Sequence, residues 1–344
     1  MIIDKLQYHG RILLANMADN EFYLPADIRP LRADVKITEN CNAKCIICDH
    51  WKNRSEDKLD KDKIIDIFKQ LASLKVRILR ISGGEPLLRK DLFDILRKFT
   101  RDDFTVVLST NGLLLNRYID EINDSIINNI KISIDAIGDK NDYIRGVKGY
   151  YNKSLGSLKY LKKKITIGSV LNNLLIDDLE QLINYCQDRG YNYDIHLPCT
   201  NTYFHESQDV SGIMKDLWPT PQNTHKALDI LEKYNILSGT LLDNAKSYLL
   251  TRKFQFNHCI LGFIKIYIDS QGNVRTGCYE YKPVGNLMHS SLEEIISSHK
   301  YRNSVLNMFN FKCRGCTCGC GISATYSKPL KSIKYLIKRM KEIN

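Results

Sequence analysis

The stretch Glu39-Asn-Cys-Asn-Ala-Lys-Cys-Ile-Ile-Cys-Asp-His-Trp51 is the most informative part of the sequence, because it spaces three cysteines as Cys41-x3-Cys45-x2-Cys48. They are too close together to be pairwise crosslinks of a fold, and they follow a strand-like run over 33–38. Three thiolates on one loop can hold three corners of a [4Fe–4S] cluster, which normally takes four Cys ligands. One iron would then be open to a small molecule. A structural zinc loop, or unconnected buried thiols, are the alternatives.

The bulk composition places these cysteines in an ordinary globular protein. The 344 residues suit one large domain plus a smaller one, and 43% hydrophobic and 26% charged residues are typical contents. No apolar run approaches the ~18 residues of a membrane span, and no signal peptide is recognisable. Eleven cysteines without an export signal favour metal binding in a reducing cytoplasm over disulfides. We therefore expect a cytoplasmic protein.

The net charge of the chain does not by itself identify a binding partner. A net charge of +11, from 50 basic and 39 acidic residues, is compatible with an anionic partner. Zinc-finger spacing, an aromatic RNA-binding signature and a basic zipper are all missing from the sequence, so we expect no nucleic acid. The segment 328–341 carries six basic residues and an apolar face. We expect this basic C-terminal helix to pack on the body, with peripheral contact to a membrane surface as the alternative.

Hydrophobic periodicity predicts alternating strands and helices over the first 200 residues. Strands are expected at 33–38, 76–82, 104–110, 130–135, 165–171 and 193–198, and helices at 60–74, 91–99, 115–127, 153–163 and 176–189. Such alternation predicts a parallel sheet built of βαβ units. Further on, we expect a helix at 223–234, a hairpin of strands 263–269 and 274–279, and a helix at 291–309.

Polar motifs follow three of the predicted strands at the ends where parallel folds gather their chemistry. Ser82-Gly-Gly-Glu-Pro86 ends the second strand, and its glycines let backbone approach a ligand closely. Ser109-Thr-Asn-Gly112 ends the third, with hydroxyl and amide groups that suit a ribose. Ser133-Ile-Asp135 ends the fourth strand. Each motif alone is equally typical of an ordinary turn or a surface ion pair.

Taken in order, these segments resemble the CxxxCxxC, GGEP and STNG motifs of radical S-adenosylmethionine (SAM) enzymes. The resemblance implies that Cys41, Cys45 and Cys48 hold a [4Fe–4S] cluster whose open iron is chelated by the amino and carboxylate groups of SAM. The implied SAM-binding residues are Gly83, Gly84, Glu85, Pro86, Ser109, Asn111, Ser133, Asp135 and Arg145. In the family, the GGEP segment binds the SAM amino group, the acid of the SxD segment reaches the ribose, and a basic residue such as Arg145 pairs with the SAM carboxylate. Ile47 departs from the family, which usually places an aromatic residue there over the adenine.

The resemblance also implies the architecture, a partial (β/α)6 TIM barrel followed by a small SPASM/twitch-like auxiliary iron–sulfur domain. We accordingly divide the chain into an N-terminal extension (1–32), the barrel (33–200), a bridging region (201–256), the auxiliary domain (257–325) and the basic C-terminal helix (326–344).

Six further cysteines in the C-terminal part resemble the ligand set of a twitch domain. They suffice for one auxiliary [4Fe–4S] cluster, for which the implied ligands are Cys259, Cys278, Cys313 and Cys316. Cys318 and Cys320 lie outside the usual spacing and are alternates for Cys316. A structural zinc site is the alternative, because four thiolates also suit zinc.

The implied activity is reductive cleavage of SAM to a 5′-deoxyadenosyl radical that abstracts a hydrogen atom from a substrate carbon. We expect oxidation, dehydrogenation or epimerisation of a sugar-like small molecule or a peptide, carried out by a monomer with a ferredoxin- or flavodoxin-type electron donor. Cys199, after the sixth strand, is a candidate hydrogen-atom donor, although a buried thiol with no chemical role is the commoner case. Maturation of a ribosomally made peptide is an alternative. Outside this class, the alternatives are an iron–sulfur electron-transfer protein without SAM chemistry and a zinc-stabilised binding protein.

Overall fold

The computed structural model describes residues 29–48, 50–52, 56–198, 217–252, 258–259, 261–278, 281–310, 312 and 325–326. Cys199, Cys313, Cys316, Cys318 and Cys320 lie outside these residues, as do nearly all of the predicted N-terminal extension and basic C-terminal helix. Among the described helices, none combines the length and apolar character needed to cross a membrane.

One mixed sheet of nine strands forms the centre of the molecule, in the order β10-β9-β8-β1-β2-β3-β4-β5-β6. The six predicted strands are all present and pair in parallel, each with its neighbour in sequence. Their bounds are β1 Arg32–Lys36, β2 Ile78–Ser82, β3 Thr105–Thr110, β4 Ile127–Ser133, β5 Lys164–Val170 and β6 Asn192–His196. Within the described residues the edge strands β6 and β10 do not pair with each other, so the barrel stays open. The predicted partial barrel is therefore confirmed.

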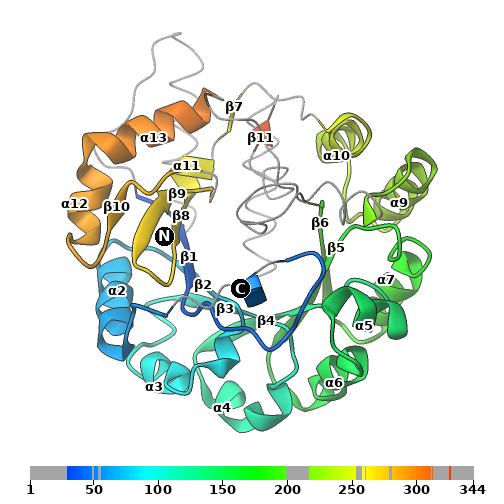
Figure 1. Cartoon of the computed structure of the whole chain (residues 1–344), viewed down its shortest axis with the longest axis horizontal. Coiled ribbons are helices and arrows are strands. Elements are labelled where there is room, and N and C mark those ends of the chain that lie inside the picture. Colours follow the sequence, from blue (N-terminus) through cyan, green and yellow to red (C-terminus); the bar gives the residue numbers. More distant parts are fainter. Residues whose placement is uncertain are drawn as a thin grey trace.

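Helices cover the outer side of the curved sheet, as Figure 1 shows. Their bounds are α2 Lys61–Ser73, α3 Leu92–Leu96, α4 Ile119–Asp124, α5 Asp139–Arg145, α6 Tyr150–Gly156, α7 Leu179–Asp188, α9 Pro221–Lys233 and α10 Thr240–Thr251. Single 3-10 turns lie at His50–Lys52, Pro86–Leu88, Leu115–Arg117 and Leu158–Tyr160. The predicted helix 60–74 corresponds to α2, in which the apolar face with Ile64, Ile67 and Phe68 is buried and the Asp60 side chain caps the first turn.

The predicted hairpin is present, but it does not stand apart from the barrel. The short helix α11 (Leu261–Ile264) leads into β8 (Lys265–Ile268), which pairs antiparallel with β9 (Asn273–Thr276). β8 also pairs in parallel with β1, so the sheet continues across the predicted boundary between barrel and auxiliary domain. The remaining short strands are β7 His258–Cys259, β10 Gly285–Asn286 and β11 Thr325–Tyr326.

The single helix predicted over 291–309 is wrong, because two helices occupy this segment. α12 (Leu292–Ser297) ends and α13 (His299–Phe309) begins at Ser298, whose backbone is extended with φ −69° and ψ 148°. The Ser298 hydroxyl donates to Ile295 O and accepts from Tyr301 N, so one side chain ends one helix and caps the next. Periodicity alone carries no signal for such a break.

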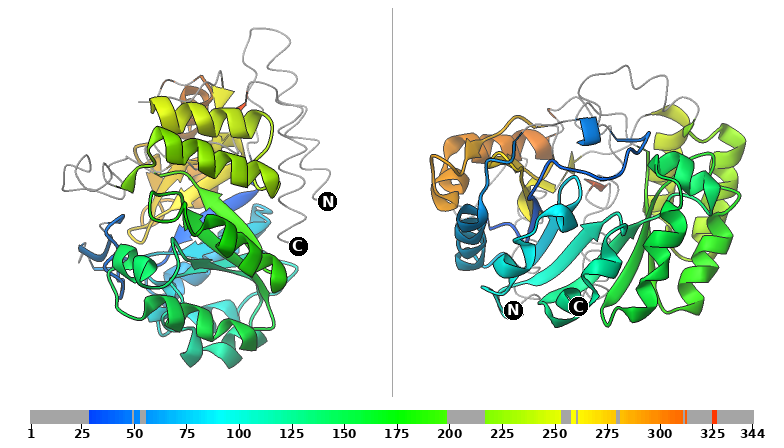
Figure 2. Two further views of the ribbon diagram at one scale, coloured as in Figure 1. Left: turned by 90° about the vertical axis from the view of Figure 1, so that its right-hand side faces the viewer. Right: turned by 60° about the horizontal axis from the view of Figure 1, so that its bottom comes forward.

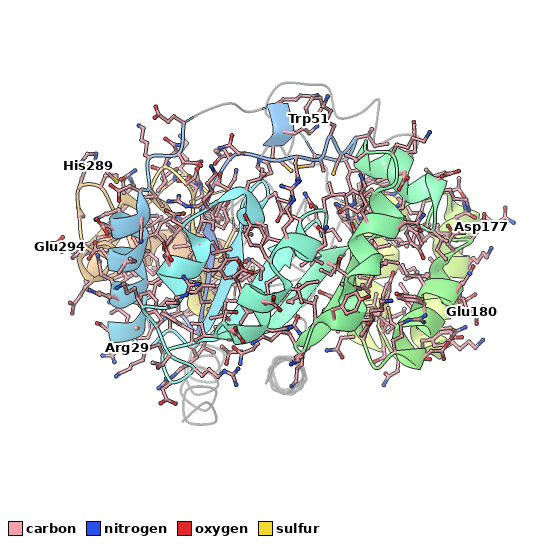
Figure 3. The ribbon with its side chains drawn as sticks, turned by 90° about the horizontal axis from the view of Figure 1, so that it is seen from below. Arg29, Trp51, Asp177, Glu180, His289 and Glu294 are labelled. Carbon is pink, nitrogen blue, oxygen red and sulfur yellow. The ribbon has the colours of Figure 1, made fainter. Side chains whose placement is uncertain are left out.

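The two faces of the sheet have opposite chemistry. Side chains that point toward the helices are apolar and fully buried, among them Val35, Leu79, Leu108, Ile130 and Ile167. The alternate residues on the inner, concave face are mostly polar. This alternation directs side chains such as Arg80, Lys131 and Asp194 into the barrel, and the parallel pairing brings the polar strand ends to one side. Figure 2 shows the segment after β1 crossing that side, and Figure 3 places Trp51 there, opposite Arg29.

Candidate functional site

The cysteine loop is held by backbone hydrogen bonds to the end of α5. Lys44 N donates to Arg145 O at 3.2 Å, and Ile46 N donates to Ile144 O at 2.9 Å. The Trp51 indole adds a hydrogen bond of 3.2 Å to Cys45 O. Helix α5 has no apolar periodicity long enough to predict it, and no pattern in the sequence indicated that it braces this loop.

The GGEP segment packs directly against the chain entering the cysteine loop. Gly84 N donates to Thr38 O at 2.8 Å, and Glu85 N donates to Asn40 O at 2.7 Å. A Cβ atom on Gly84 would lie 2.2 Å from Asn40 O, and one on Gly83 would lie 2.6 Å from Thr38 O. The glycines therefore permit close contact between two backbones, a role that the sequence motif did not reveal.

The Glu85 carboxylate joins the second and third strand ends. It is fully buried and accepts from the Thr110 hydroxyl at 2.6 Å and from Asn111 N at 2.7 Å. It also accepts from Leu87 N at 3.1 Å, which caps the following turn. Burial raises the pKa of Glu85 to about 7, against the lowering effect of these hydrogen bonds. Asn111 continues the network by donating to Asn42 Oδ1 at 2.6 Å, inside the cysteine loop.

Arg145 and Asp135 form a buried ion pair beside the loop. Arg145 Nη2 lies 2.6 Å from Asp135 Oδ2, and Arg145 Nη1 lies 3.9 Å from Cys45 Sγ. Burial lowers the pKa of Arg145, but the negative charge of Asp135, together with contributions from Tyr150 and Cys45, raises it overall. Asp135 Oδ1 accepts from Val170 N at 2.7 Å. Arg145 Nε is buried without a hydrogen-bond partner among the described residues, which leaves one donor available to an anionic ligand.

The three thiols of the loop share one environment. Burial raises the pKa of Cys41 to about 11 and that of Cys48 to about 12, and the charges of the neighbouring thiols contribute to both shifts. The described part of the chain contains no group of three His, Cys, Asp or Glu side chains that converge on a single metal ion.

The other SAM-binding candidates lie on the same strand ends. The Ser109 hydroxyl accepts from Arg80 Nε at 2.8 Å, so it points into the barrel. Ser133 ends β4, and its carbonyl accepts from the Tyr150 hydroxyl at 3.0 Å. Tyr150, fully buried beneath the Arg145 guanidinium, is a contact that the motifs did not indicate.

The auxiliary cysteines are only partly placed. Cys259 is buried in β7, which pairs with β11, and Cys278 follows β9. These two of the four predicted ligands flank the α11–β8–β9 segment. The choice among Cys316, Cys318 and Cys320 as the completing ligand stays a prediction.

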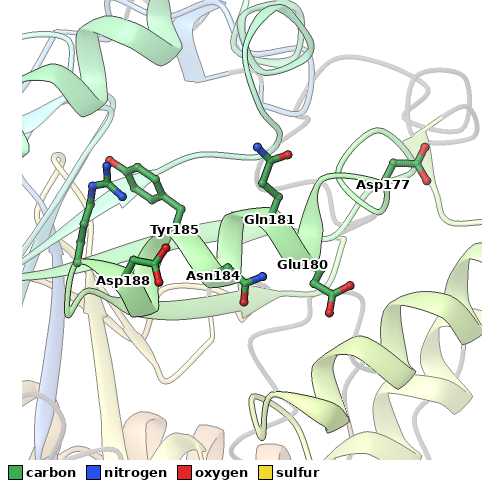
Figure 4. A pocket seen from close by; sticks show the side chains of 7 residues that line it. Asp177, Glu180, Gln181, Asn184, Tyr185 and Asp188 are labelled. Atoms are coloured by element: carbon green, nitrogen blue, oxygen red, sulfur yellow. The ribbon is translucent and has the colours of Figure 1, made fainter.

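A separate surface pocket of about 560 Å³ lies along α7, lined by Asp177, Glu180, Gln181, Asn184, Tyr185, Asp188 and Arg189 (Figure 4). Figure 3 shows Asp177 and Glu180 at the outer edge of the molecule, away from Trp51. Its acidic side chains are largely solvated and two are paired with lysines of α9, so it contributes nothing to the site.

The structure combines an open parallel barrel with a loop of three cysteines at its strand ends. This combination indicates an iron–sulfur enzyme. A sequence profile of the radical SAM superfamily matches residues 35–186, and a profile of the SPASM iron–sulfur cluster-binding domain matches residues 259–317. The chain belongs to the radical SAM superfamily. Its cofactors are a [4Fe–4S] cluster, SAM and an auxiliary iron–sulfur cluster.

Relatives in sequence support the same assignment. Two proteins named probable GTP 3′,8-cyclase, from two strains of Methanococcus maripaludis, are 31% and 30% identical over 204 and 217 residues. These matches cover 56% and 59% of this chain and 66% and 72% of the relatives. A pre-heme d1 synthase from Dinoroseobacter shibae is 29% identical over 184 residues, 50% of this chain and 45% of its own.

Solved structures show the same fold at lower identity. SuiB of Streptococcus suis bound to S-adenosylmethionine superposes with a TM-score of 0.63 at 15% identity, covering 91% of this chain and 78% of SuiB. The native anSMEcpe structure with bound AdoMet has a TM-score of 0.61 at 16% identity, covering 91% of this chain and 99% of that one.

Proposed function

We propose that this chain removes a hydrogen atom from a substrate carbon, with Cys41, Cys45 and Cys48 as the ligands of the SAM-binding cluster. The cluster and SAM, when bound, supply a 5′-deoxyadenosyl radical by one-electron cleavage. The observation that carries the proposal is the convergence of the cysteine loop, the GGEP backbone and the Arg145 guanidinium at one group of strand ends. A loop that only bound zinc would require neither the GGEP backbone nor the Arg145 guanidinium beside it.

The chain's own residues fit the cofactor. Arg145 Nη1 lies 3.9 Å from Cys45 Sγ, and Nε of the same guanidinium has no hydrogen-bond partner among the described residues, so this side chain suits the SAM carboxylate. Asp135 is fully buried and bound to Val170 N and Arg145, so we assign it to holding Arg145 in place rather than to contacting the ribose. Asn111, tied to Asn42 and Glu85, fixes the third strand end beside the loop.

We propose a small molecule as the substrate. Relatives about 30% identical carry names of enzymes that act on a small molecule, which favours a sugar-like or nucleotide-like substrate. A peptide substrate is the second candidate. SuiB has been solved bound to the precursor peptide SuiA, but that likeness concerns the fold alone. Oxidation, epimerisation and ring formation remain separate outcomes for the substrate radical.

The proposal is tested by SAM cleavage. Protein reconstituted anaerobically and reduced with dithionite is expected to convert SAM to methionine and 5′-deoxyadenosine. The variant Cys41→Ala/Cys45→Ala/Cys48→Ala should form neither product, whereas Cys186→Ala, which removes a buried thiol of α7, should match the wild type. An electron carrier without SAM chemistry would leave SAM intact in every sample. A zinc protein would give no brown colour and about two zinc ions per chain.

The fate of the substrate radical has its own test. Solvent deuterium should enter the product of an epimerase, and Cys199→Ala should then stop turnover without stopping SAM cleavage. Normal turnover by that variant would exclude Cys199 as the hydrogen-atom donor. We further propose a monomer that receives electrons from a ferredoxin or flavodoxin, which size-exclusion chromatography and reduction by a purified flavodoxin would test.

A further inference from the structure

The concave face of the sheet carries an ionic cluster where a packed barrel would hold Val, Ile and Leu. Lys131 on β4 reaches both Asp194 and His196 on β6, which is two strands away. The neighbours of Lys131 in sequence, Ile130 and Ile132, point the other way and are fully buried against the helices. The strand alternation therefore directs Lys131 into the barrel.

The path of Lys131 depends on a glycine in the intervening strand. A Cβ atom on Gly168 of β5 would lie 2.4 Å from Lys131 Cε, so the lysine side chain occupies the space that any larger residue would fill. Gly168 is the register partner of both Ser133 on β4 and Asp194 on β6. A strand with a side chain at this point would separate Lys131 from its two partners.

Further charged side chains extend the cluster along the same face. Arg80 of β2 donates to the Ser109 hydroxyl and lies 3.9 Å from Asp34. Asp34 of β1 pairs with Arg32 at 2.5 Å and with Lys265 of β8 at 3.4 Å. We call Arg32, Asp34, Arg80, Lys131, Asp194, His196 and Lys265 the concave-face cluster. It contains four cationic side chains and two carboxylates, and therefore has an excess of positive charge.

His196 is the most accessible member, with 36% of its side chain exposed. The charge of Lys131, together with burial, lowers the pKa of His196 to about 4, so the imidazole is neutral at physiological pH. The Arg32 and Arg80 side chains are also partly exposed, at 30% and 25%. The buried ion pairs of this cluster add little to the free energy of folding, because the cost of desolvating two charges is generally as large as their attraction. Stabilising the sheet is therefore not a sufficient reason for these charges.

We propose that Lys131, His196 and Arg80 contact the substrate and bind an anionic, oxygen-rich group on it, either a phosphate or a carboxylate. Asp194 holds Lys131 in position, and Gly168 leaves room for it to cross β5. The inference rests on the proposed function, because it specifies the substrate of that site. It assigns no role in cleaving SAM to any member of the concave-face cluster.

The test uses anion binding to the reconstituted protein with SAM present. Inorganic pyrophosphate and malonate are titrated calorimetrically under anaerobic conditions at constant ionic strength, so that general screening does not vary. We expect the wild type to bind one of the two. Lys131→Met should bind that anion about tenfold more weakly, as expected for loss of one charge-assisted hydrogen bond. Lys226→Met, which removes an exposed lysine paired with Asp177, should bind as the wild type does.

A second variant changes no charge. Gly168→Ala should displace the flexible end of Lys131 and weaken binding of the same anion several-fold. Gly156→Ala in α6 is the matched control, because a Cβ atom there meets nothing within 4 Å. If Lys131→Met misfolds, anion binding by Gly168→Ala, compared with Gly156→Ala, still tests the role of Lys131.

The outcomes separate this inference from the proposed function. Preference for pyrophosphate identifies a phosphate-bearing substrate, and preference for malonate identifies a carboxylate. Binding of neither anion, or equal losses in Lys131→Met and Lys226→Met, overturns the inference. SAM cleavage is measured on the same preparations. Cleavage without anion binding defeats only the substrate assignment, whereas wild-type protein that cannot cleave SAM defeats the proposed function.

Discussion

Glu85 lies at the candidate site, but its carboxylate contacts the protein and holds the site in shape. Its carboxylate accepts from Thr110, Asn111 and Leu87 while fully buried, so it fixes two strand ends against each other. The motif placed Glu85 at the site, but sequence could not tell whether it faces SAM or the protein. That distinction depends on which donors surround the carboxylate in three dimensions.

Glu85 should make stability fall as pH rises. Its pKa in the folded protein is about 7, above the ordinary value of 4.5, so the folded state binds the extra proton between these values. Wild-type protein should therefore lose up to about 3 kcal/mol of stability from this group between about pH 5 and 7. Glu85→Gln should lack this loss. Urea denaturation of both proteins from pH 5 to 8 measures it, and parallel pH profiles would contradict it.

Gly84 should tolerate no side chain. Because a Cβ atom would lie 2.2 Å from Asn40 O, Gly84→Ala must push the cysteine loop away from the GGEP segment. We expect a loss of about 1–3 kcal/mol in unfolding free energy and a reduced iron content after reconstitution. Gly156→Ala, with open space around its Cβ, should lose neither. Equal iron contents in the two variants would show that this contact does not position the loop.

Asp135 should matter chiefly as the counterion of Arg145. Asp135→Asn leaves a buried guanidinium without its partner at 2.6 Å and should cost about 3–5 kcal/mol of unfolding free energy. Asp177→Asn removes an exposed carboxylate from an ion pair of similar length and should change stability by less than about 0.5 kcal/mol. Thermal or urea denaturation compares them. If the two variants are equally stable, the buried pair is not the brace that we describe.

At the scale of elements, the long periodic segments were predictable and the short polar ones were not. The apolar stripe of α2 and the six apolar strand runs determine their own burial, so sequence places them within a few residues. Helix α5 has only seven residues and few apolar ones, yet its carbonyls bind the cysteine loop. The pairing of β8 with β1 is a contact between distant segments, and no local pattern encodes it.

Ser298 should contribute about as much to the free energy of unfolding as a typical helix N-cap. Ser298→Ala removes the acceptor for Tyr301 N and the donor to Ile295 O, so we expect a loss of about 1 kcal/mol. Ser73→Ala, at an exposed hydroxyl that bonds within α2, should have a much smaller effect. Urea denaturation measures both losses. A neutral Ser298→Ala would mean that the break between α12 and α13 is enforced by packing instead.

At the scale of the whole molecule, the motifs and the strand alternation were enough to predict an open barrel with its chemistry at one end. They could not predict the concave-face cluster, because Lys131, Asp194 and His196 come from strands two apart and meet only across Gly168. The ionic residues inside the barrel, not the motifs, carry the information about substrate.

We propose above all that the cysteine loop holds a [4Fe–4S] cluster with one iron open to SAM. This proposal is tested most directly by Mössbauer spectroscopy of protein reconstituted with ⁵⁷Fe, recorded with and without SAM. We predict that one iron site of one cluster shifts when SAM is added, and that the shift is lost in Cys41→Ala/Cys45→Ala/Cys48→Ala. Spectra that SAM leaves unchanged in the wild type, or a shift that survives in the triple variant, would contradict the account.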